Sequence, residues 1–260
     1  TLALGGLRQR YFVNPVMPIR ELPDELISQI AAGEVIERPA SVVRELVDNA
    51  LDAGAKQITL RLLAGGVRAI VGEDDGSGIN AAELPLAFKR HATSKIQNLH
   101  DLESVATMGF RGEALAAINS VAACSISSKQ AQAEHAWLMD GRTGEISIAS
   151  RSTGSTVEVK ELFFSVPARR KFLKSDNTEL AHCVEAVRRH ALVRPAVGFA
   201  IWHEGKLLEQ WRPGSLAERV GAVLGQDFIA NALPIQYELA SDFGGIRVHG
   251  FAGLPDAARS

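Results

Sequence analysis

Apolar residues repeat with a helical period between Ser41 and Ala53, a segment with the sequence SVVRELVDNALDA. Residues at the spacing of one helix face are apolar, namely Val43, Leu46, Val47, Ala50 and Leu51. Ser41 is the predicted N-cap, because its hydroxyl can accept a hydrogen bond from a first-turn amide. The pattern predicts one amphipathic helix that ends at Gly54.

The rest of the chain alternates between strand-like and helix-like patterns. Predicted strands cover 58–62, 67–72, 123–128, 136–139, 145–150, 156–163, 199–202, 207–211, 235–239 and 246–251. Predicted helices cover 25–32, 81–90, 113–121, 177–192 and 215–224, the last two capped by Asn177 or Thr178 and by Ser215. Consecutive strands separated by short turns indicate an α+β domain with a mixed, mostly antiparallel sheet.

Composition narrows the class of protein only slightly. The 260 residues are 46% hydrophobic and 22% charged, and 28 basic against 30 acidic residues give a net charge of -2. This balance excludes a protein that is strongly basic overall but allows a local basic groove. The two cysteines favour an intracellular, reducing location, and no apolar run reaches the length of a membrane span. We treat 1–16 as an extension, 17–195 as the main domain, and 196–260 as the start of a second domain after Pro195.

Three polar side chains of the predicted helix lie on one stripe. Glu45, Asn49 and Asp52 follow one another at i, i+4 and i+7, with Asp48 at their edge. Such a stripe could serve a hydrated cation and a water nucleophile, since magnesium needs only one or two protein oxygens beside phosphates. The alternative is a solvated helix face, which is the ordinary fate of acidic side chains.

Glycine-rich and basic segments supply the other candidate sites. Asp74 and Asp75 precede Gly76-Ser77-Gly78 at a strand end, where a flat ring could lie against the backbone, or where the chain simply forms an acidic turn. The weakly periodic segment 91–112 is typical of a mobile lid, and its glycines lead into a helix N-terminus suited to phosphate. The basic run 167–174 could bind nucleic acid or be an exposed helix start.

Taken together, these motifs resemble the amino-terminal ATPase region of the MutL family of DNA mismatch-repair proteins, which has the Bergerat fold of the GHKL ATPases. The matching segments are AAGEVIERPASVVRELVDNALDAGA (31–55), DDGSGI (74–79), RHATSK (90–95), GFRGEAL (109–115), GSTVEV (154–159) and PARRKFLK (167–174). Their order and spacing are specific to this family. The sequence has no G-x-x-x-x-G-K-[ST] motif, which argues against a P-loop enzyme.

The resemblance implies a role for each matched residue. Glu45 would be the general base, Asn49 the magnesium ligand, and Asp74 the acceptor for the adenine amine. Thr156 would support the adenine end of the pocket. Further nucleotide-binding positions would be Asp52, Ala53, Gly78, Ile79, Thr93, Ser94, Lys95, Gly109, Phe110, Arg111, Gly112, Glu113, Ala114 and Leu115. The basic residues Arg169, Arg170, Lys171 and Lys174 would contact DNA.

The implied function is a slow, ATP- and Mg²⁺-dependent conformational switch in bacterial mismatch repair. ATP would order the lid and drive homodimerisation, and the partners would be a MutS-type recognition protein, a downstream nuclease or helicase, and non-specific DNA. The expected location is the cytoplasm, at the nucleoid during repair, with no membrane partner. A second, ribosomal-protein-like domain would supply a lysine to the γ-phosphate. We expect this sequence to stop inside that domain, before the segment that carries the lysine. A non-enzymatic binding module remains an alternative. A histidine kinase fits less well, because it would need a phospho-acceptor helix and we find none in this sequence.

Overall fold

The computed structural model describes residues 36–92, 113–240 and 245–255. Its helices are α2 (Pro39–Asp52), η1 (Ala64–Gly66), α3 (Leu84–Ala87), α5 (Ala114–Val121), α6 (Pro167–Arg170), α7 (Asp176–Val193), α8 (Leu216–Leu224) and α9 (Gln226–Ala230). Its strands are β1 (Gln57–Leu63), β2 (Ala69–Asp74), β3 (Ala123–Lys129), β4 (Ala136–Asp140), β5 (Ile146–Ala149), β6 (Gly154–Lys160), β7 (Gly198–His203), β8 (Lys206–Trp211), β9 (Ala232–Leu239) and β10 (Ile246–Gly253). The predicted helix 25–32 and the extension 1–16 lie outside the described residues.

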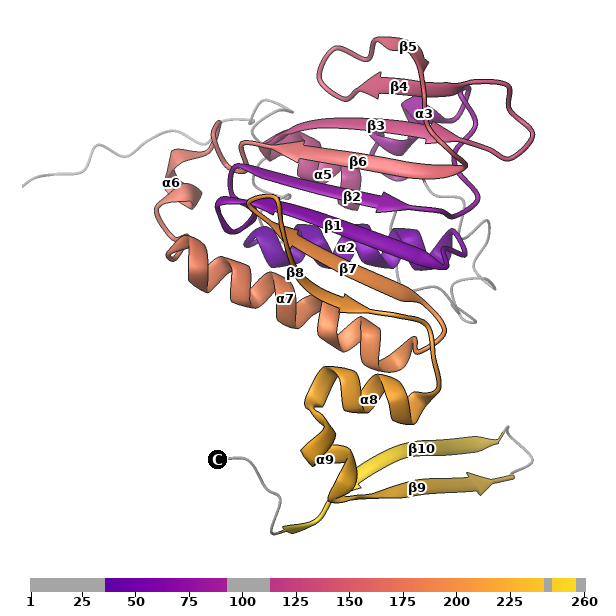
Figure 1. The fold of residues 1–260 in the computed structure, drawn as a ribbon. Helices are drawn as coiled ribbons and strands as arrows, with labels where there is room; N and C mark the ends of the chain where they lie inside the picture. The colour runs from indigo at the N-terminus through magenta and orange to yellow at the C-terminus, as the bar shows by residue number, and fades with distance from the viewer. Residues whose placement is uncertain (1–35, 93–112, 241–244, 256–260) are drawn as a thin grey trace, which may run out of the picture.

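An eight-stranded sheet carries most of the molecule, in the order β5-β4-β3-β6-β2-β1-β7-β8. All neighbouring pairs are antiparallel except β1 and β7, which run parallel. This confirms the predicted α+β class with a mixed, mostly antiparallel sheet. Helices α2, α5 and α7 pack on one face, as Figure 1 shows, and no helix of the described residues covers the other face.

The core lies between that face and the helices. Alternate side chains of β1, Ile58, Leu60 and Leu62, are at most 2% exposed and pack against the apolar face of α2. Gly72 in β2 lets α2 approach, because a Cβ there would lie 3.1 Å from Leu46 Cδ1. The period-3.6 face of a helix and the period-2 face of a strand thus fix how α2 sits on the sheet.

The first predicted cap is wrong, since the N-cap of α2 is Arg38, three residues before Ser41. Pro39 occupies the first turn after Arg38, and no side chain caps the helix. A proline suits that place because its φ is already helical and it lacks an N–H that would be unpaired there. Ser41 therefore lies inside the first turn, where its hydroxyl accepts a 3.4 Å hydrogen bond from Glu37 N.

Two further predictions need correction. The helix expected over 81–90 is only the short α3, because Pro85 lacks the N–H and its ring would clash with a preceding turn. The N-cap of α7 is Ser175, whose hydroxyl accepts from Thr178 N, rather than Asn177 or Thr178. The predicted cap Ser215 of α8 is confirmed, with Glu218 completing a capping box.

The proposed boundary at Pro195 also conflicts with the sheet. Strands β7 and β8 follow Pro195, yet they are the last two strands of the eight-stranded sheet, and Phe199, Ile201 and Trp211 belong to its core. We therefore propose that the first domain ends after Trp211. Beyond it, α8 and α9 lead to the β9–β10 hairpin, which lies apart from the large sheet in Figure 1.

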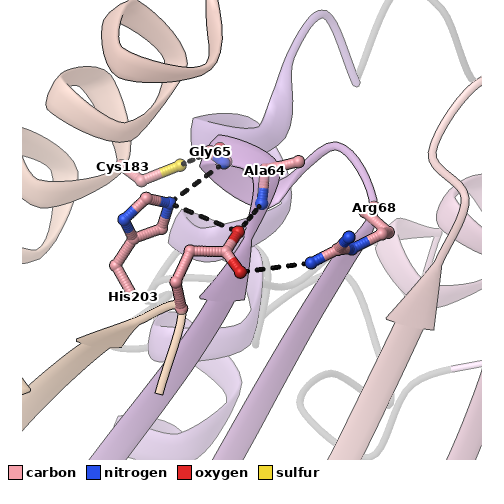
Figure 2. A network of polar contacts seen from close by, with 6 residues as sticks. Ala64, Gly65, Arg68, Cys183 and His203 are labelled. Carbon is pink, nitrogen blue, oxygen red and sulfur yellow. Dashed lines mark hydrogen bonds and ion pairs between the residues drawn. The ribbon is translucent and has the colours of Figure 1, made fainter. Parts of the chain in front are cut away.

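A polar network closes the end of the sheet at which β1 and β7 stop. Figure 2 shows Ala64 and Gly65 of the β1–β2 turn beside the β7–β8 turn. The Glu204 carboxylate accepts from Ala64 N at 2.7 Å and pairs with Arg68 at 3.1 Å, while Cys183 Sγ donates to Gly65 O.

Burial raises the pKa of the Cys183 and Cys124 thiols to about 12, so neither is a thiolate nucleophile at neutral pH.

Candidate nucleotide site

The structure places the three polar side chains predicted to share one stripe of α2 at half-buried positions. Glu45, Asn49 and Asp52 line one side of the helix, while Leu46 and Val47 on the other side are buried in the core. Glu45 Oε1 lies 3.8 Å from Arg44 Nη2, and the Glu45 side chain is 19% exposed. The stripe is therefore neither fully solvated nor buried, which suits side chains that contact a bound ligand.

Asp48, which the sequence places at the edge of this stripe, has a different role. It is 8% exposed, and its Oδ1 lies 2.8 Å from His190 Nε2 in α7. His190 Nδ1 lies 2.8 Å from Ala186 O, which can only accept, so both ring nitrogens face acceptors. Burial opposes the charge on His190, but the hydrogen bonds to Asp48 and Ala186 outweigh it and raise the His190 pKa. The pair fastens α2 to α7.

Asp74 ends β2 with its carboxylate on the same side of the sheet as α2. Its Oδ1 accepts from Gly76 N at 2.8 Å and from Ser155 N at 3.2 Å. Burial raises the Asp74 pKa, and these amides together with Arg151 counteract part of that rise. A half-buried carboxylate with one oxygen held by amides leaves the other oxygen for a ligand donor.

The turn after Asp74 is tied to the end of α2. Ser77 N donates to Ala53 O at 2.9 Å, and a Cβ on Gly76 would lie 2.8 Å from Ala53 Cβ. The structure thus brings Ala53, just after α2, into contact with the turn that follows Asp74. Glycine is required at position 76 because there is no space for a side chain.

Asp75 differs from its neighbour, although the sequence did not separate the two carboxylates. Its Oδ1 accepts from Lys56 N at 2.7 Å and Gln57 N at 2.8 Å, at the start of β1. Asp75 therefore fixes the turn against β1, and Asp74 alone faces the pocket. No signal near Asp75 in the sequence reveals this role, because its partners lie 18 and 19 residues away.

Gly78 and Ile79 close the other side of the turn. Gly78 has φ 72°, and a Cβ there would lie 2.2 Å from Lys129 O. Ile79 N donates to Ser128 Oγ at 2.7 Å, and this buried hydroxyl lies 2.9 Å from Ser155 Oγ. Sequence reasoning missed Ser128 and Ser155, which support the pocket from β3 and β6.

The prediction for Thr156 is not supported by the register of β6. Thr156 pairs with Glu73 and Ser127, whereas Ser155 donates its amide to Asp74. Because successive side chains of a strand point to opposite faces, Thr156 lies on the face away from the Asp74 carboxylate. Ser155 occupies the position that we expected for the threonine.

Other predicted residues fall at or beyond the edge of the description. Thr93, Ser94, Lys95, Gly109, Phe110, Arg111 and Gly112 lie outside the described residues. Glu113, Ala114 and Leu115 stand at the start of α5, and Leu115 packs against the core. His91 Nδ1 lies 2.9 Å from Glu113 Oε1, so the two flanks of 93–112 meet.

The basic run forms the short helix α6 and the segment after it, at the opposite end of the sheet from Asp74. Arg170, Lys171 and Lys174 are exposed. Arg169 is half-buried and donates to Ile36 O at 3.4 Å, which gives it a structural contact. The surface available to a polyanion is thus formed by three of the four predicted residues.

Magnesium would fit this site as an oxygen-bound, partly hydrated ion. Within the described ranges, no three His, Cys, Asp or Glu side chains cluster as a ligand cage. The Asn49 amide oxygen and the nearby carboxylates of Glu45 and Asp52 are the kind of oxygen donors that Mg²⁺ uses when phosphates and water complete its coordination shell.

Among the described residues, no helix is long and apolar enough to cross a membrane.

Comparison with known proteins identifies the family. Residues 36–159 match the model of histidine kinase-, DNA gyrase B- and HSP90-like ATPases. The DNA mismatch repair protein MutL of Ralstonia nicotianae is 56% identical over 93% of this chain, and that of Herminiimonas arsenicoxydans 51% identical over 94%. The Aquifex aeolicus MutL ATPase domain, solved with ADP, superposes with a TM-score of 0.62 and 30% identity over 78% of this chain and 73% of its own.

The chain belongs to the MutL family. It spans 37% and 40% of the length of the two curated relatives, and it corresponds to their ATPase region. The likeness to the MutL ATPase domain also confirms the Bergerat-type α+β fold that the motifs implied.

Proposed function

We propose that this chain binds ATP with Mg²⁺ between α2 and the end of β2 and hydrolyses it slowly. The observation that carries the proposal is the hydrogen bond from Ser77 N to Ala53 O, which joins the polar stripe of α2 to the Asp74 turn. This contact holds the helix of Glu45 and Asn49, the proposed base and metal ligand, close to the turn of Asp74, the proposed acceptor for adenine. The ADP-bound Aquifex aeolicus domain, which shares this fold, supports a nucleotide as the ligand.

The reaction needs a positioned water and a pocket that holds the phosphates in line. In this proposal Glu45 accepts the proton of the attacking water, because its half-buried carboxylate stands on the stripe that faces the nucleotide. Asn49 would hold Mg²⁺, which would supply charge neutralisation to the phosphates. Asp74 would accept from the adenine amine, and α2, locked by Asp48 and His190, would keep Glu45 and Asn49 in place.

ATP binding and turnover, measured on one preparation with Mg²⁺ and then with EDTA, test this proposal. We expect Mg²⁺-dependent binding with slow hydrolysis, and we expect Asn49→Ala to weaken Mg²⁺-dependent binding by about 10-fold or more, since each 1.4 kcal/mol is a factor of ten. Asn231→Ala, an exposed asparagine between α9 and β9, is the matched control. No ATP binding by the wild-type chain would favour the alternative, a partner-binding module without nucleotide chemistry.

Family membership supports further proposals about partners. We infer that ATP drives homodimerisation, and that the full protein works in the cytoplasm with a MutS-type recognition protein, a downstream nuclease or helicase, and DNA. Sedimentation velocity with and without ATP and Mg²⁺ tests the first point, and an unchanged monomer would count against it. Co-sedimentation with purified mismatch-repair proteins of the same bacterium tests the others.

A further inference from the structure

Arg151 precedes β6 and is not part of any motif that the family resemblance used. Its guanidinium donates to three main-chain carbonyls, Asp74 O at 2.8 Å, Ser127 O at 3.1 Å and Ser152 O at 2.9 Å. Asp74 ends β2 and Ser127 lies in β3, and these strands flank β6 on either side. One side chain therefore fastens both neighbours of β6 at the edge where the candidate nucleotide site lies.

Arg151 acts on Asp74, the proposed acceptor for adenine, through the main chain of Asp74. Asp74 O is held by Arg151, and the same oxygen lies where a Cβ on Gly154 would come within 2.1 Å. Gly154, at φ 117°, thus permits the close approach of β6 to β2. Because Asp74 Oδ1 takes the amides of Gly76 and Ser155, the Asp74 residue is fixed at both its main chain and its side chain.

The charge of Arg151 matters as well as its hydrogen bonds. The charged groups that act on the Asp74 carboxylate are Arg151, which favours its ionised form, and Asp75, which opposes it. Burial is the largest influence and also opposes ionisation. Arg151 therefore favours the ionised form of this half-buried carboxylate.

We propose that Arg151 is a positioning and specificity-determining residue: its hydrogen bonds anchor Asp74 at the end of β2, so that the pocket prefers adenine over guanine nucleotides. This inference rests on the proposed function. An ionised carboxylate accepts from the exocyclic amine of adenine, whereas guanine in the same pose presents a carbonyl oxygen that the carboxylate repels. A protonated Asp74 could donate to that oxygen, so the preference depends on charge.

The experiment measures the dissociation constants of ATP and GTP between pH 6 and pH 8. The ratio of the two constants isolates the base, because protonation of the phosphates affects both nucleotides alike. The variants are Arg151→Gln, which removes the charge, and Arg151→Lys, which keeps the charge but not the planar fork. Arg61→Gln is the matched control. Arg61 lies in β1 and pairs with Glu73, the residue before Asp74 in β2, without touching Asp74.

We expect Arg151→Gln to reduce the preference for ATP over GTP by about tenfold, the size of one lost charged hydrogen bond. The reduction should be no smaller at pH 6 than at pH 8, because protonation of Asp74 becomes more favourable as pH falls. Arg151→Lys should bind both nucleotides more weakly but keep the wild-type pH profile of the ratio. Arg61→Gln should match the wild type. A ratio that is unchanged in Arg151→Gln, or an equal loss for ATP and GTP at every pH, would overturn the inference.

Wild-type binding separates this inference from the proposed function. A wild-type chain that binds neither nucleotide would overturn both. A wild-type chain that prefers ATP, beside an Arg151→Gln variant with the same preference, would overturn only the role of Arg151. If Arg151→Gln is not folded by thermal melting, Arg151→Lys still decides the point, because a change in its pH profile would contradict the charge argument.

Discussion

The Asp48 carboxylate of α2 shows how local chemistry depends on a distant partner. Asp48 stands one residue from Asn49, yet its partner His190 is 142 residues away in the sequence. The buried pair joins α2 to α7 with a charged hydrogen bond, which is stronger than a neutral one. The helix that carries the candidate base is thus held by a contact that takes no part in nucleotide binding.

This pair predicts a pH dependence of stability. The His190 pKa is raised in the folded state, so its contribution is fully present below the unfolded value of about 6.5 and is lost as pH rises through the folded value. His190→Gln should remove that contribution and lower the free energy of unfolding by about 1–3 kcal/mol at pH 6. Denaturant unfolding of both proteins from pH 6 to pH 8.5 should show the gap narrowing.

The control for this prediction is His182→Gln in the same helix. His182 is exposed, so its replacement should leave stability nearly unchanged at every pH. A gap between wild type and His190→Gln that stays constant across the pH range would mean that His190 is neutral in the folded protein.

At the scale of elements, the connection between the sheet and the following helices is made by one buried arginine. Arg219 in α8 is 1% exposed and donates to the carbonyls of Ala191, Arg194, Pro195, Val197 and Arg212, between 2.6 and 3.2 Å. Ala191 lies in the last turn of α7, where carbonyls lack helical partners. Arg219 therefore fastens α8 to the end of the helix that also carries His190.

The sequence predicted the elements that depend on local patterns. The period of α2, the two strands on either side of the β1–β2 turn, and the cap at Ser215 each depend on residues that are close in the sequence. The Glu45 stripe and the Asp74 turn could be placed as motifs for the same reason. Local propensity also explains two errors. Pro39 starts α2 before the predicted cap Ser41, and Pro85 interrupts the helical pattern predicted over 81–90.

The remaining features depend on contacts between distant segments. Nothing near Asp75 reveals that its carboxylate holds Lys56 N, and nothing near Arg151 reveals its bond to Asp74 O. Ser155 replaced Thr156 as the pocket residue because the register of β6 on β2 and β3 decides which side chain faces the site. The addition of β7 and β8 to this sheet likewise follows only from the parallel pairing of β7 with β1.

At the scale of the whole molecule, a net charge of -2 coexists with an exposed basic segment at one end. This segment, with Arg170, Lys171 and Lys174, lies at the opposite end of the sheet from the turn after Asp74. DNA and ATP would therefore occupy separate surfaces. Separation of this kind allows DNA to bind without blocking the nucleotide.

We predict that DNA binding is sequence-independent and weakens steeply with salt. The logarithm of the affinity should fall linearly with the logarithm of salt concentration, and replacing all three residues by glutamine should reduce the slope by about one for each lost phosphate contact. Fluorescence anisotropy on a short duplex measures this, with Arg142→Gln in the β4–β5 turn as a control. Binding that ignores salt, or an unchanged slope in the triple variant, would remove this surface from the account.

The most direct test of the central claim, that α2 carries the catalytic base of an ATP site, compares Glu45→Ala with the wild type. Equilibrium binding of ATP with Mg²⁺ and turnover are measured on the same samples. The account predicts that Glu45→Ala keeps ATP affinity and loses hydrolysis by about 100-fold or more, the usual contribution of a general base. An equal loss of binding and hydrolysis, or full hydrolysis without this carboxylate, would contradict it.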